Sequence, residues 1–140
     1  MALKVLRWIA VLPVSILGAA LVTFPIHWLI GLMYYGDKPF LGLLSADILE
    51  RLLMAFTTPF FMILTGAWTA PMRRVETGVA LSIIIALILG GMYVFTFVGN
   101  SQYMSGWDSL HYGATPALNL VGIATALYTV RHNWRTTKIS

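Results

Sequence analysis

The sequence predicts an all-α membrane protein in which four transmembrane helices form an antiparallel bundle. Of the 140 residues, 59% are hydrophobic and only 10% are charged, whereas roughly a quarter of the residues in a typical soluble protein are charged. A soluble chain of this size would need far more polar groups to cover its surface. The composition therefore excludes a soluble enzyme, a disordered tail and a nucleic-acid-binding domain as first interpretations, and we expect no nucleic acid as a partner.

Four apolar segments are each long enough to cross a bilayer. The expected spans cover residues 8–35, 51–71, 77–98 and 112–131. A transmembrane helix needs about 20 residues, whereas the strands of a membrane barrel would alternate apolar and polar residues. The stretch Leu81–Leu89 has no such alternation. No repeat, linker or low-complexity tract divides the chain, so residues 1–140 form a single domain.

The first span resembles a signal peptide at its start but continues much further. Lys4 and Arg7 precede an apolar run, and small residues follow at 18–20, as in a cleavable signal. The apolar run then continues to Leu32. We therefore expect a retained signal-anchor helix, tilted or bent, with Pro25 the first candidate for a bend because proline removes an internal hydrogen bond.

The other helix ends carry weaker local signals. Ser45 suits an N-cap of the second helix, with Asp47 in the positive first turn. Asp47 and Arg51 lie four residues apart and can pair on one helix face. The connection before the third span is short, residues 73–76, and Glu76 suits the start of that helix. A longer polar connection, residues 99–108, precedes the fourth span.

The basic residues predict the orientation in the membrane. With the N-terminus inside, all but two of them are cytoplasmic, and only Lys38 and Arg51 lie outside. The expected inside residues are Lys4, Arg7, Arg73, Arg74, Arg131, Arg135 and Lys138. By the positive-inside rule we expect a multi-pass protein of the cell (inner) membrane, with both termini cytoplasmic.

Histidines are the candidate cofactor ligands, because the chain has no cysteine. His27, near Pro25, and His111, at the start of the last span, are expected at similar depth on the outer side. Together they are a candidate pair for haem or another cofactor. The alternative for His27 is a structural role, with the imidazole bonded to a carbonyl that Pro25 leaves free.

Carboxylates on the outer side suggest a second candidate site. Asp108 and His111 lie one helical turn apart, as do Asp47 and Glu50. With His27, these oxygen and nitrogen ligands form a candidate metal site. The alternative is that Asp47 and Asp108 only occupy first turns, where the helix dipole favours an anion.

Polar residues inside the spans suggest a third kind of site. Thr57 and Thr58 precede Pro59, which frees a backbone carbonyl, and Asn119 is an amide within the last span. Together they are a candidate polar path, with bending and helix contact as the alternatives. Small residues four apart, such as Gly122 and Ala126, favour close helix packing.

These features favour a non-catalytic role. No Asp, Glu, Lys or Arg lies in the middle of a span, and no catalytic residue is assigned. We expect a small accessory or interaction subunit whose partners are the lipid bilayer and either another membrane protein or a second copy. Two alternatives remain: an oligomeric channel or transporter component, and a haem-, metal- or quinone-binding membrane subunit.

Overall fold

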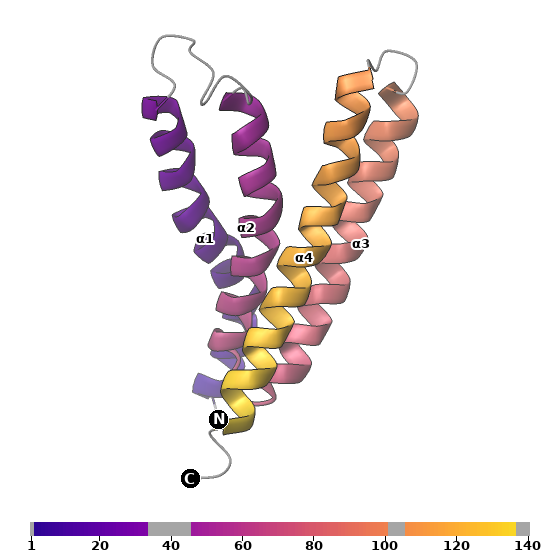
Figure 1. Cartoon of the computed structure of the whole chain (residues 1–140). Coiled ribbons are helices and arrows are strands. Elements are labelled where there is room, and N and C mark those ends of the chain that lie inside the picture. Colours follow the sequence, from indigo (N-terminus) through magenta and orange to yellow (C-terminus); the bar gives the residue numbers. More distant parts are fainter. Residues whose placement is uncertain (1, 34–45, 101–105, 137–140) are drawn as a thin grey trace.

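The computed structural model describes residues 2–33, 46–100 and 106–136, and these residues are almost entirely helical (Figure 1). The helices are α1 (Ala2–Met33), α2 (Ala46–Thr69), α3 (Arg74–Asn100) and α4 (Gly106–Thr136). The all-α prediction is confirmed. The predicted N-cap Ser45 lies outside the described residues, whereas Asp47 and Glu76 occupy the first turns of α2 and α3 as expected.

Each helix is long and apolar enough to cross a membrane. The apolar windows are Leu3–Met33, Asp47–Thr69, Arg74–Val98 and Gly113–Asn133. Helix α1 continues through Pro13 and Pro25. Its window of 31 residues corresponds to roughly 46 Å at 1.5 Å per residue, which exceeds the roughly 30 Å of bilayer hydrocarbon. The chain is therefore a multi-pass membrane protein by length and composition.

The connection between α2 and α3 lies three residues earlier than the sequence suggested. Residues 70–73 form the turn, and residues 74–76 already belong to α3. Pro71 explains the early end of α2, because proline disfavours helical backbone at the residue before it. Arg73 then takes a φ of 55°, and its carbonyl accepts hydrogen bonds from the backbone N–H (2.9 Å) and the hydroxyl (3.1 Å) of Thr77.

Helix α2 is the centre of the arrangement, since it contacts each of the other three helices, whereas α1 packs against α2 alone among the described helices. Helix α4 packs against both α2 and α3. We call the end with the α2–α3 turn the closed end, because the helices converge there; α1 begins and α4 ends at this end (Figure 1). At the opposite end, which we call the open end, the pair α1–α2 diverges from the pair α3–α4.

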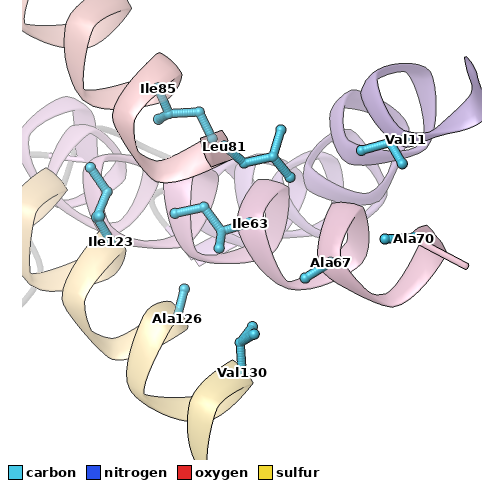
Figure 2. Close-up of a cluster of buried hydrophobic side chains, with 9 residues drawn as sticks. All are labelled: Val11, Ile63, Ala67, Ala70, Leu81, Ile85, Ile123, Ala126 and Val130. Atoms are coloured by element: carbon cyan, nitrogen blue, oxygen red, sulfur yellow. The ribbon is translucent and has the colours of Figure 1, made fainter. Parts of the chain in front are cut away.

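The packed core joins all four helices in the half of the bundle nearer the closed end. Figure 2 shows its nine buried side chains, which are small or β-branched in most cases. They are Val11, Ile63, Ala67, Ala70, Leu81, Ile85, Ile123, Ala126 and Val130. Small side chains let helix backbones approach closely, which is the main source of packing energy between helices in lipid.

Polar groups within this core are satisfied by their own helices. Ser15 donates to the Val11 carbonyl at 2.8 Å, and Ser82 donates to the Gly78 carbonyl at 2.7 Å. Both side chains are buried. Because each hydroxyl is bonded four residues back, the described core contains no buried side-chain polar atom that lacks a partner. The packed core near the closed end therefore has a structural role.

Candidate functional site

Two contacts between basic and acidic side chains lie at the open end. His27 of α1 and Glu50 of α2 meet there, with Nδ1 donating to Oε1 of the carboxylate at 2.5 Å. The side chains are 62% and 30% exposed, respectively. The contact joins the last two turns of α1 to the second turn of α2. An exposed pair of this kind adds little stability.

An ion pair lies at the same end of α2. Arg51 Nη2 donates to Asp47 Oδ2 at 3.1 Å, and the side chains are 48% and 78% exposed. This confirms the pairing that the four-residue spacing predicted. Two of the three carboxylates of the predicted metal site thus have different partners, because Glu50 contacts His27 and Asp47 contacts Arg51.

A cavity of about 180 Å³ lies between α2, α3 and α4 in the half of the bundle nearer the open end. Its lining is mainly apolar with several polar groups: Arg51, Leu89, Met92, Tyr93, Thr96, Thr115 and Asn119. Arg51 is the charged residue of this lining. The cavity lies where the pair α1–α2 diverges from the pair α3–α4 (Figure 1).

One of the three residues of the predicted polar path lines this cavity. Asn119 lines the cavity, whereas Thr57 and Thr58 are not among its lining residues. The Thr57 hydroxyl donates to the Leu53 carbonyl at 2.8 Å within α2. A path that joins all three residues stays a prediction.

The predicted cofactor and metal sites rest partly on side chains that are not described. Asp108 and His111 belong to α4, but their side chains lie outside the described part of the chain. Among the residues that are described, no three His, Asp or Glu side chains gather as metal ligands. The haem and metal assignments that use Asp108 and His111 stay predictions.

Sequence reasoning missed most of the cavity. Leu89, Met92 and Tyr93 look like ordinary lipid-facing or core residues in an apolar helix, and no local signal separates them from their neighbours. The lining offers hydrogen-bond donors and one cation beside an apolar wall, which suits an amphiphilic molecule. Comparison with protein-family models, curated proteins and solved structures finds no match to this chain.

Proposed function

We propose that this chain is a non-catalytic accessory subunit of the cytoplasmic (inner) membrane that binds a membrane-embedded partner, another protein or a second copy, through its open end. Both termini are cytoplasmic in this proposal, so the open end faces outward. Four helices that are long and apolar enough to span a membrane support this proposal.

One observation carries the proposal: at the open end the side chains of His27, Asp47 and Arg51 are exposed. His27 and Arg51 have side chains 62% and 48% exposed, and both lie within segments that are apolar enough to be membrane spans. Charged groups that face lipid are costly, and polar partners reduce this cost. A partner that covers the open end would supply such groups.

The orientation gives a direct prediction. Because the chain has no cysteine, each introduced cysteine is the only thiol. We expect Lys38→Cys to react with a membrane-impermeant maleimide in intact cells. Lys138→Cys is expected to react only after the membrane is permeabilised. The positive-inside distribution is the reason. The reverse labelling pattern would contradict cytoplasmic termini.

The partner can be captured by crosslinking at two matched tryptophans. Trp28 lies at the open end of α1 and is 61% exposed, whereas Trp68 lies near the closed end of α2 and is 65% exposed. We replace each in turn with the photo-crosslinking residue p-benzoylphenylalanine in the full chain. We expect position 28 to give a discrete protein adduct in native membranes and position 68 to give none.

The mass of the adduct identifies the kind of partner. An adduct of twice the chain mass means self-association, and any other discrete mass means a different protein. Irradiation that gives no protein adduct at position 28, or equal adducts at both positions, would argue against a partner at the open end.

A further inference from the structure

We propose that the cavity between α2, α3 and α4 binds one phospholipid of the phosphatidylethanolamine type. In this proposal Arg51 holds the lipid phosphate, Asp47 holds its ammonium group, and one acyl chain enters the cavity. The lipid site shares Arg51 and Asp47 with the open end, but the protein partner is tested at Trp28 of α1, which does not line the cavity. Either proposal can therefore fail without the other.

The charges are arranged in the order of the headgroup. Asp47 precedes Arg51 by four residues on α2, which corresponds to about 6 Å along the helix, and it is the residue nearer the open end. In phosphatidylethanolamine the phosphate is attached to the glycerol, and the ammonium is at the far end of the headgroup. A cation with an anion one turn further out therefore matches a zwitterionic headgroup in sign and in order.

Both charged side chains can serve a ligand while they remain paired with each other. The Arg51–Asp47 contact uses Nη2 of the guanidinium, and a guanidinium has five N–H donors, which favour bidentate binding of phosphate. The Asp47 side chain is 78% exposed, so its carboxylate can accept a hydrogen bond from a primary ammonium. The pair thus presents both signs to one ligand.

The interior of the cavity suits the part of the lipid below the phosphate. Thr96 and Leu89 both line it from α3, and these residues are seven apart, or about 10 Å along the helix. The lining becomes apolar toward Leu89 and Met92. Tyr93 and Asn119 line the same cavity and carry donors that can bond the ester carbonyls.

The volume limits how much of the lipid is enclosed. The cavity measures about 180 Å³, which is room for about six groups the size of a water molecule at about 30 Å³ each. This accommodates the upper part of a single acyl chain. The remainder of that chain and the second chain would lie in the surrounding bilayer. The cavity is accessible from the bilayer where the two helix pairs diverge.

The test compares three lipids with identical acyl chains on the purified full-length protein. Phosphatidylethanolamine has a primary ammonium, phosphatidylglycerol has none, and phosphatidylcholine has a quaternary amine that cannot donate a hydrogen bond. Native mass spectrometry in a mild detergent counts the lipids retained at each concentration. We expect one phosphatidylethanolamine to be retained about tenfold more tightly than the other two, as one charge-assisted hydrogen bond allows.

Three substitutions separate the parts of the site. Asp47→Asn should remove the preference for phosphatidylethanolamine while phosphatidylglycerol binding is kept or increased, because Arg51 no longer faces a neighbouring anion. Arg51→Gln should weaken the binding of all three lipids. Met92→Trp should also weaken the binding of all three lipids, because the larger side chain fills the part of the cavity that would hold the acyl chain.

The controls are charge-matched changes away from the cavity. Glu76→Gln and Arg7→Gln remove the same charges from exposed positions near the closed end, and both should bind lipid like the unmodified chain. Circular dichroism and gel filtration verify that each variant is folded. Equal retention of the three lipids by the unmodified chain, a preference for phosphatidylglycerol, or no retained lipid at all would each overturn the proposal.

Discussion

Replacing Gly122 with alanine is expected to lower the free energy of unfolding by about 1–3 kcal/mol, the usual cost of overpacking a close contact. Gly122 lies on α4 where this helix crosses α2. A Cβ atom at this position would collide with the backbone carbonyl oxygen of Phe56 and lie 3.2 Å from Cγ of Pro59. A backbone atom cannot rotate away as a side-chain end can, so the two helices must separate.

Gly90→Ala provides the matched control for this experiment. Gly90 is also a glycine within a transmembrane helix, but nothing lies within 4 Å of the Cβ it would gain. Alanine is favoured over glycine in a helix by about 1 kcal/mol, so this variant should be unchanged or slightly more stable. Denaturant titration in detergent, monitored by tryptophan fluorescence, measures the free energy of unfolding of both variants. Equal stability of the two variants would show that the α2–α4 crossing tolerates separation.

Replacing Ile63 with alanine is expected to cost about 2 kcal/mol of unfolding free energy. Ile63 has no exposed surface, and its side chain lies in the middle of the cluster drawn in Figure 2, with Leu81 of α3 and Ile123 of α4 around it. In soluble cores an Ile→Ala change costs about 2–5 kcal/mol. We expect the lower end of that range, because lipid also provides an apolar environment for the separated helices.

The control for Ile63 is the same change on a lipid-facing surface. Ile83 of α3 is 57% exposed, so Ile83→Ala removes the same atoms without opening a cavity between helices. Its unfolding free energy should change by less than about 1 kcal/mol. The same titration compares the two variants. A loss at Ile83 as large as the loss at Ile63 would mean that the cluster does not hold the bundle together.

Helix number and local pairs were predictable because their causes are local. Four long apolar segments require four helices, and the Asp47–Arg51 pair follows from a spacing of four residues on one helix. The end of α2 was placed too late because hydropathy continues across Ala70 and Pro71. What ends α2 is a change of backbone conformation, with Arg73 in the left-handed region. A hydropathy pattern contains no signal for such a change.

Contacts between helices were much less predictable. Gly122 and Ala126 were singled out for close packing, and both are buried as expected. Gly90 lies four residues after Ala86 and so has the same small-residue spacing, yet it is exposed. Small-residue spacing indicates that one face of a helix permits close approach, but it does not say whether a neighbouring helix lies on that face.

The candidate site was hard to predict for the same reason, because it depends on how the helices pack. Asn119 was noticed because it is the single amide within the predicted spans, and it does line the cavity. The contact of His27 with Glu50 joins residues 23 apart, so it depends on the register of α1 against α2. The cavity itself depends on the divergence of the two helix pairs, and no residue in a uniformly apolar helix such as α3 encodes that angle by itself.

The attachment of α1 to α2 alone has a consequence for how the protein is made. Every helix–helix contact of α1 in the described structure is available once the first two helices are in the membrane. The core requires α4, since Ile123, Ala126 and Val130 complete it. A ribosome-bound chain can thus form its first hairpin early, while α2 keeps a second face for the last helix. The core therefore closes only after α4 has been made.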